Sequence, residues 1–213
     1  MELKKSIPFQ AGVVQATIFG GPFRQYETGT RRLVGVKMAR EIDHPHDISI
    51  PTKDYSVPDP DDMIAGLLAA IERMAEGNDL YVGCMGGIGR TGLFMAVAAK
   101  TLIAYHDGEY AKNTDPVKLV RAYYLPHAVE TSEQLSYVAS FDVGPALDLL
   151  RDLQPVDRSK YISRATHNSE TRFLSGIAQD AVLRASSAEW RIADFNERSI
   201  FGKLAFILRG QQV

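Results

Sequence analysis

The sequence is nearly without cysteine, because Cys84 is the only one among its 213 residues. A single cysteine excludes an internal disulfide and any zinc site that needs several thiolates. No apolar run reaches the roughly 18 residues that a membrane-spanning helix needs. The segment after Lys4 and Lys5 lacks a complete signal-peptide pattern, since Gln10 and Gln15 interrupt it. We therefore expect a cytoplasmic protein in a reducing compartment.

An excess of charge of one sign is also missing. The chain has 24 Lys and Arg against 26 Asp and Glu, which gives a net charge of −2. No overall basic field therefore marks a nucleic-acid or membrane binder, and we expect neither as a partner. Hydrophobic residues make up 45% and charged residues 23%, as in ordinary globular proteins. A chain of this length can bury a large core without disulfides or a structural metal.

Charge is unevenly distributed along the chain. Residues 1–150 carry a net charge of −5, and residues 151–213 carry a net charge of +3. The shift falls near Pro155 and Asp157, which also suggest a break. Ordinary fluctuation of surface charge explains this as well as a distinct C-terminal element does. We expect a domain over residues 1–153 and an extension over 154–213, either packed on the domain or used to contact a protein partner.

Hydrophobic periodicity predicts alternating strands and helices. The predicted strands cover residues 11–19, 32–38 and 80–84, and the predicted helices cover 63–74, 90–105, 116–124 and the segment from 132 onward. Residues 44–60 contain four prolines and are expected to be largely loop or extended chain. Gly144-Pro145 should break or kink the preceding helix. Further on, the pattern predicts a helix at 171–185 and strands at 190–194 and 203–208. This order indicates an α/β fold.

The segment CMGGIGRTG, which begins at Cys84, has the composition of an oxyanion cradle. Its glycines let the backbone turn tightly, so that successive N–H groups can point at a bound anion. The predicted helix that follows adds the positive end of its dipole. Arg90 can add a two-pronged guanidinium. An electropositive loop also favours the thiolate form of a cysteine at its base. The pattern therefore predicts a nucleophile beneath a phosphate-sized cradle.

This segment resembles the phosphate-binding loop of the cysteine-dependent protein tyrosine and dual-specificity phosphatases, which reads His-Cys-x5-Arg-Ser/Thr. The resemblance implies a central mixed or parallel sheet flanked by helices. It also implies that Cys84 is the nucleophile and forms a phosphocysteine intermediate, that Arg90 clamps the substrate and the transition state, and that Thr91 gives a hydroxyl to the leaving thiolate. The substrate phosphate would bind Arg90 and the loop residues Met85, Gly86, Gly87, Ile88 and Gly89.

A general acid is expected upstream of the cysteine. Val57-Pro58-Asp59 resembles the mobile loop that carries the family's acid, and it lies 25 residues before Cys84. We predict that Asp59 protonates the leaving group. Its close alternatives are Asp54, Asp61 and Asp62. Asp59 would also suit a helix cap, and the two roles can coexist.

Residues 125–138 resemble the family's Gln-Thr-x-x-Gln segment, which orients the hydrolytic water. Glu130 stands at the position of the first glutamine, and Gln134 matches the second. The alternative is that Thr131 and Gln134 only form a capping box. One position departs from the family pattern, because Gly83 replaces the histidine that helps hold the loop and the thiolate.

These features predict a metal-free and cofactor-free protein phosphatase that hydrolyses phosphotyrosine, with phosphoserine and phosphothreonine as further candidates. Its substrates would be phosphorylated proteins or peptides, and its loop would bind oxyanions such as phosphate, sulfate or vanadate. Gly83 keeps open an alternative, a phosphate-binding pseudophosphatase or a scaffolding subunit with the same fold. A thiol redox enzyme is disfavoured, since the chain offers no second cysteine to resolve a sulfenate.

Overall fold

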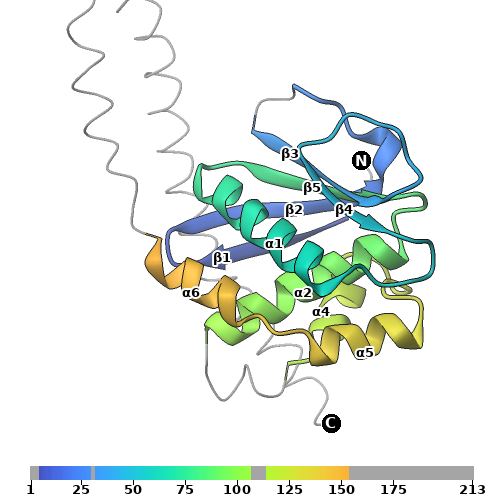
Figure 1. The fold of residues 1–213 in the computed structure, drawn as a ribbon. Coiled ribbons are helices and arrows are strands. Elements are labelled where there is room, and N and C mark those ends of the chain that lie inside the picture. Colours follow the sequence, from blue (N-terminus) through green and yellow to red (C-terminus); the bar gives the residue numbers. More distant parts are fainter. Residues whose placement is uncertain (1–4, 30–31, 107–113, 154–213) are drawn as a thin grey trace, which may run out of the picture. The chain divides into compact units, whose positions relative to one another are not determined.

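The structure is a computed structural model, and it describes residues 5–29, 32–106 and 114–153 (Figure 1). The chain divides into two units, Met1–Pro155 and Val156–Val213. The predicted extension over 154–213, with its helix at 171–185 and its strands at 190–194 and 203–208, lies outside the described residues.

Five strands form one mixed sheet in the order β1-β2-β5-β3-β4. Their bounds are Ser6–Ala11 (β1), Val14–Pro22 (β2), Leu33–Ala39 (β3), Ile48–Thr52 (β4) and Asp79–Cys84 (β5). β1 runs antiparallel to β2, and the other neighbours are parallel. The expected α/β architecture with a mixed sheet is therefore confirmed. The strand that ends at Cys84 occupies the middle of the sheet.

Both edge strands differ from the sequence prediction. The sequence predicts one strand over 11–19, but the structure has a hairpin of β1 and β2 that turns at Gly12, where φ is +56°. It also predicts loop or extended chain over 44–60, and the structure forms the extended strand β4 there. Each unpredicted strand contains a proline, Pro8 in β1 and Pro51 in β4. A proline has no N–H for the ladder, so in the middle of a strand it is found mainly at an edge of the sheet. Both strands lie at such edges.

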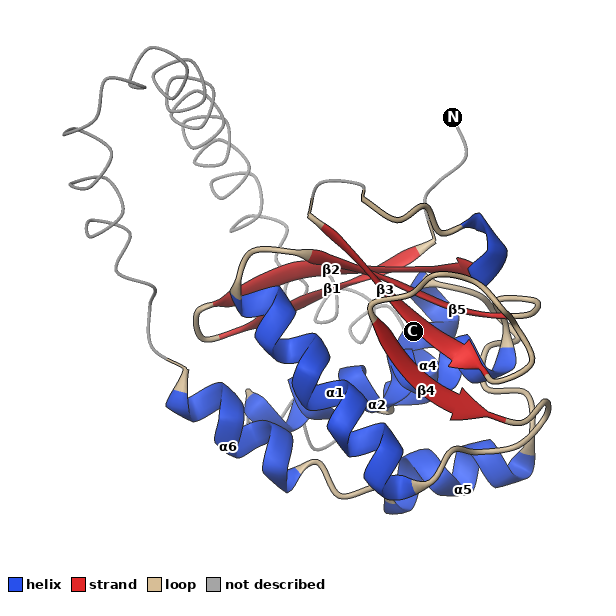
Figure 2. Ribbon diagram, turned by 45° about the horizontal axis from the view of Figure 1, so that its top comes forward, coloured by secondary structure: helices blue, strands red, loops and turns tan. Residues whose placement is uncertain are grey.

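The helices that hydrophobic periodicity predicts are present in the structure. Their bounds are Phe23–Gln25 (η1, a 3-10 turn), Pro60–Ala75 (α1), Gly89–Tyr105 (α2), Pro116–Tyr123 (α4), Ser132–Ser140 (α5) and Gly144–Asp152 (α6). As predicted, the chain breaks near Gly144-Pro145, because α5 ends and α6 begins there. Figure 2 shows these α-helices gathered beneath the sheet, and α1 and α2 both contact β2, β3 and β5. Within the described ranges, no helix has the length and hydropathy needed to cross a membrane.

Aromatic side chains cover the sheet near β3 and β5. The ring of Tyr26 stacks on those of Phe23 and Tyr81, and it lies against Gly35. The Tyr26 hydroxyl donates a hydrogen bond to Asp47, which also accepts one from the Gly35 N–H at 2.7 Å. Burial and then the Asp47 carboxylate raise the pKa of Tyr26 to about 12. Asp47 thus ties the segment between β3 and β4 to the sheet.

Candidate active site

Cys84 lies at the carboxyl end of the central strand β5. It is a free cysteine, and only 3% of it is exposed. Residues 85–88 form the loop that follows, and α2 begins at Gly89. The N-cap residue of α2, Ile88, makes no side-chain hydrogen bond to the start of the helix. The first N–H groups of α2 therefore receive no cap from this residue. A buried thiol, a short loop and a helix N-terminus are therefore consecutive in the chain.

The loop packs closely against β2 through Gly87. This residue has a φ of +70°, a conformation that favours glycine. A Cβ at this position would lie 2.7 Å from both the Gly21 Cα and the Pro22 N. By contrast, a Cβ at Gly86 would meet nothing nearer than Ile88 at 4.0 Å. Gly87 is thus required by backbone and packing together, whereas Gly86 faces open space.

Gly83 stands where the resemblance leads us to expect histidine, and the structure gives a reason. A Cβ at Gly83 would lie 2.7 Å from the Cα of Phe23 and 2.8 Å from the carbonyl oxygen of Gly21. Both are backbone atoms, so no side-chain rotation can relieve the contact. The close approach of β2 and η1 to β5 therefore requires glycine here.

Arg90 is buried in the first turn of α2, with 2% exposed. Its two terminal nitrogens donate to the two carboxylate oxygens of Glu41, at 2.9 and 2.7 Å. One of them also donates to the Thr52 carbonyl at 2.9 Å, and the other lies 2.8 Å from a carboxylate oxygen of Asp54. Burial lowers the pKa of Arg90, but the Glu41 hydrogen bonds and the negative charges of Cys84, Glu41 and Asp54 raise it overall. The guanidinium is therefore fixed as a cation close to Cys84.

Glu41 is a site residue that the sequence analysis missed. Its hydrogen bond to Arg90 lowers the pKa of its carboxyl, which keeps the pair ionised. Glu41 lies 49 residues before Arg90, in the segment that Asp47 ties to the sheet. The only signal in the sequence was that a buried arginine needs a carboxylate partner. That rule does not say which of 26 acidic residues supplies it.

The four candidate acids are separated by their contacts. Asp59 is the N-cap of α1, and its Oδ1 accepts a hydrogen bond from the Asp61 N–H at 2.9 Å, which confirms the capping alternative. Asp61 and Asp62 lie in the first turn of the same helix. Asp54 instead pairs with Arg90. Of the four carboxylates, Asp54 is therefore the one that contacts Arg90 in the described ranges.

Gln134 and Glu130 lie beside the start of α2. A Cβ added to Gly89 would overlap the Glu130 carboxylate and lie 3.3 Å from Oε1 of Gln134. The capping box is present, since Thr131 Oγ1 accepts from the Gln134 N–H at 3.1 Å. The buried Gln134 amide accepts from the Glu130 N–H at 2.8 Å and donates to the Ser56 carbonyl at 3.1 Å. Gln134 thus joins α5 to the loop of Asp54, and its water-orienting role stays a prediction.

Thr91 is fully buried next to Arg90. In the described part of the chain, its Oγ1 has no hydrogen-bond partner. Buried hydroxyls are nearly always paired, so an unpaired one calls for an explanation. An unpaired hydroxyl can donate a hydrogen bond to a group that becomes negatively charged only during a reaction. The predicted role of Thr91, donation to the leaving thiolate, is of this kind.

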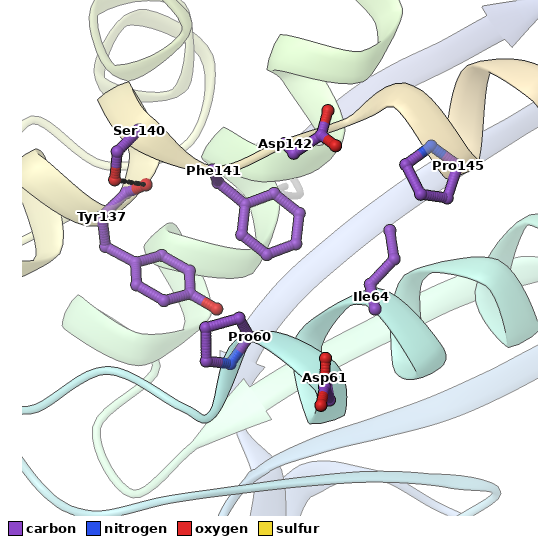
Figure 3. A pocket seen from close by; sticks show the side chains of 8 residues that line it. All are labelled: Pro60, Asp61, Ile64, Tyr137, Ser140, Phe141, Asp142 and Pro145. Carbon is purple, nitrogen blue, oxygen red and sulfur yellow. Dashed lines mark hydrogen bonds between the residues drawn. The ribbon is translucent and has the colours of Figure 1, made fainter.

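A cavity of about 340 Å³ lies between the start of α1 and the end of α5 (Figure 3). Its lining contains none of the loop residues from Cys84 to Arg90, and consists of Pro60, Asp61, Ile64, Tyr137, Ser140, Phe141, Asp142 and Pro145. The hydroxyl of Tyr137 lies near Pro60 in Figure 3. Burial and then the charges of Asp59 and Asp62 raise the pKa of Tyr137. This cavity therefore adjoins Asp59 but is separate from the cradle.

Comparisons with known proteins give distant similarities. No family model matches the chain. Two uncharacterized proteins of Methanocaldococcus jannaschii, MJECL20 and MJ0215, are 32% and 33% identical to it over 92 residues. Those residues are 43% of this chain and 56% and 52% of the two relatives. The chain thus spans about half the length of the curated relatives it matches.

Among solved structures, the chain is similar to Tk-PTP in a glycine-to-alanine mutant form, with a TM-score of 0.47 and 20% identity over 67% of this chain and 97% of that one. It is also similar to Tk-PTP in its active form, with a TM-score of 0.44 and 22% identity over 65% and 92%. A kinase associated phosphatase whose catalytic cysteine is replaced by serine gives a TM-score of 0.41 and 13% identity over 72% and 100%.

Proposed function

We propose that the protein is a cysteine-dependent phosphatase that hydrolyses phosphotyrosine in cytoplasmic proteins, with phosphoserine and phosphothreonine as further substrates. One observation carries this proposal: the buried thiol of Cys84 and the buried, permanently charged Arg90 flank a glycine loop that opens a helix. The site therefore combines a nucleophile with backbone and guanidinium donors. Phosphoryl transfer depends on this kind of positioning and charge stabilisation.

The proposed reaction has two steps. In the first, the Cys84 thiolate attacks phosphorus, the bond from phosphorus to the leaving oxygen breaks, and a protonated aspartate gives its proton to that oxygen. In the second, water attacks the phosphocysteine, the sulfur–phosphorus bond breaks, and the same aspartate takes the proton of the water. Arg90 and the loop N–H groups stabilise the charge on the phosphoryl oxygens in both steps. Thr91 would donate to the thiolate as it leaves.

Exposed apolar residues next to site residues in the sequence support an aryl phosphate as substrate. Tyr55, Met85 and Leu135 are three of the exposed large hydrophobic residues in the described ranges, with 65%, 45% and 38% exposed. Each directly follows a site residue in the chain, namely Asp54, Cys84 and Gln134. Ligand sites typically combine apolar side chains with a few polar groups. A phenyl ring would contact such side chains, whereas the short stem of phosphoserine would contact fewer of them.

Hydrolysis of p-nitrophenyl phosphate in EDTA tests the proposal. We expect a bell-shaped dependence of kcat/KM on pH, and competitive inhibition by vanadate. Binding of vanadate or tungstate without turnover at any pH would support the alternative of a phosphate-binding pseudophosphatase or scaffolding subunit. Turnover that EDTA abolishes would contradict the thiolate mechanism.

We assign the general acid to Asp54 in preference to Asp59. Asp54 contacts Arg90, so it lies beside the guanidinium that would bind the phosphate, whereas one oxygen of Asp59 is used by the helix cap. We expect Asp54→Asn to lower kcat for phenyl phosphate by roughly 100-fold, the lower end for general acid catalysis. The effect on p-nitrophenyl phosphate should be smaller, because nitrophenolate leaves without needing a proton. The alkaline limb of the pH–rate profile should disappear.

Asp59→Asn is the matched control for this experiment. Asparagine caps helices about as well as aspartate, so this change preserves α1. We expect it to keep the alkaline limb and most of the activity on phenyl phosphate. If Asp59→Asn loses the limb and Asp54→Asn keeps it, the acid is Asp59, as the sequence predicts, and the assignment to Asp54 is wrong.

A further inference from the structure

Tyr124 reaches the phosphate loop from the far end of α4. It is the C-cap residue of that helix and is 5% exposed. Its hydroxyl donates a hydrogen bond to the carbonyl oxygen of Gly87, in the middle of the loop. Burial, and then the negative charges of Cys84 and Tyr81, raise the pKa of Tyr124. The hydroxyl therefore keeps its proton and remains a donor close to the thiol.

The sheet is shaped to admit this ring. A Cβ at Gly20 of β2 would lie 2.7 Å from the Tyr124 ring and 2.7 Å from the terminal methyl group of Met95. The missing side chain at Gly20 therefore gives the ring its place between β2 and α2. The ring is held on its apolar sides by packing, and its single polar atom is directed at Gly87.

The hydrogen bond sets the direction of one peptide group. The peptide between Gly87 and Ile88 is trans, so its C=O and N–H point in opposite directions. Because Tyr124 holds the Gly87 carbonyl, the N–H of Ile88 points away from Tyr124. The dihedral angles here are irregular, with φ of +70° at Gly87 and φ and ψ of −117° and −80° at Ile88, so no regular ladder fixes this peptide.

We infer that Tyr124 is a positioning residue for the oxyanion cradle, and this rests on the proposed function. It holds the peptide so that the Ile88 N–H faces the bound phosphoryl group. It thereby supports the loop from the helix side, where position 83 cannot carry a histidine. An anion and its transition state need donors that are already oriented, since reorienting a peptide during the reaction costs free energy.

Tungstate binding measured by calorimetry tests this inference without requiring turnover. We expect Tyr124→Phe, which removes one oxygen atom, to weaken tungstate binding by about tenfold, the range for one hydrogen bond to a charged group. On p-nitrophenyl phosphate it should lower kcat more than it raises KM, because the donor matters most in the transition state. Tyr123→Phe is the matched control, as it removes the same atom from the neighbouring, less buried residue. It should change neither quantity.

Gly20→Ala provides a second, independent variant, because it displaces the ring and keeps the hydroxyl. Thermal unfolding first defines a temperature at which every variant is folded. At that temperature, weaker tungstate binding in both Tyr124→Phe and Gly20→Ala supports the inference. Unchanged tungstate affinity in Tyr124→Phe overturns it, even where the melting temperature falls. Wild-type protein that binds tungstate without turnover contradicts the proposed activity alone, and wild-type protein that binds no tungstate overturns the inference too.

Discussion

Replacing Cys84 with serine should abolish phosphate release from p-nitrophenyl phosphate, with a loss of kcat on the order of 10⁴-fold or more, as for other removed nucleophiles. The serine hydroxyl keeps the shape of the side chain but stays protonated at neutral pH, so it is a far weaker nucleophile than a thiolate. Glu41, Arg90 and the loop backbone are untouched by this change. We therefore expect tungstate affinity to stay within about threefold of wild type, well below the tenfold that one lost charged hydrogen bond is worth.

The single cysteine makes this test unusually clean. Cys84 is the only thiol that iodoacetate can alkylate, so modification of this thiol and loss of activity should follow the same time course, and vanadate should protect against both. A Cys84→Ser protein that still releases phosphate at the wild-type rate would show that the thiol is not the nucleophile.

The parts of the site that the sequence predicts are those encoded locally. Strand β5, the loop and helix α2 are consecutive in the chain, so their glycines, their apolar runs and Arg90 can be interpreted together. The capping box at Thr131 and the cap at Asp59 are also local, and both are confirmed. Hydrogen bonds within one turn of a helix depend on spacing alone, which is why these features appear in the sequence.

The missed parts depend on contacts between distant segments. Glu41 meets Arg90 across 49 residues, and Tyr124 meets Gly87 across 37. Neither residue belongs to a periodic pattern that marks its role. Their positions follow from where β3 and α4 end relative to the loop, which only the folded sheet defines. The general acid is a related case: the sequence predicts Asp59 with Asp54 as a close alternative, and the contact of Asp54 with Arg90, 36 residues further along the chain, appears only in the folded structure.

The sequence does not predict the edge strands as separate strands, and the reason is different. Prolines in β1 and β4 count against a strand in any local pattern, although an edge strand with one free side accepts them. Whether a segment lies at an edge is a property of the whole sheet. Strand order therefore had to be known before these two segments could be recognised.

Gly83 departs from the family pattern, and packing against β2 and η1 explains this departure. Substitutions at Gly83 therefore test the structure most sharply. We expect Gly83→Ala to lower the free energy of unfolding by roughly 3 kcal/mol, the upper end for overpacking, and Gly83→His by more. The φ of Gly83 is not positive, so alanine would fit the backbone conformation, and the cost comes from contact alone. That contact is with the backbone of Gly21 and Phe23, which can move only if β2 or η1 shifts.

Gly86→Ala is the matched control, since it adds the same methyl group two residues into the loop, where the nearest atoms are 4.0 Å away. Chemical denaturation should show less than about 1 kcal/mol change for it, as for substitutions that neither overpack nor leave a cavity. If Gly83→His is instead folded, as stable as wild type and more active, then packing does not explain the missing histidine. In that outcome the loop would lack a support that histidine restores, and the assignment of this support to Tyr124 would lose its structural basis. If Gly83→His is destabilised while Gly86→Ala is not, the packing of this sheet requires glycine at position 83. The missing histidine is then no evidence against an active cysteine.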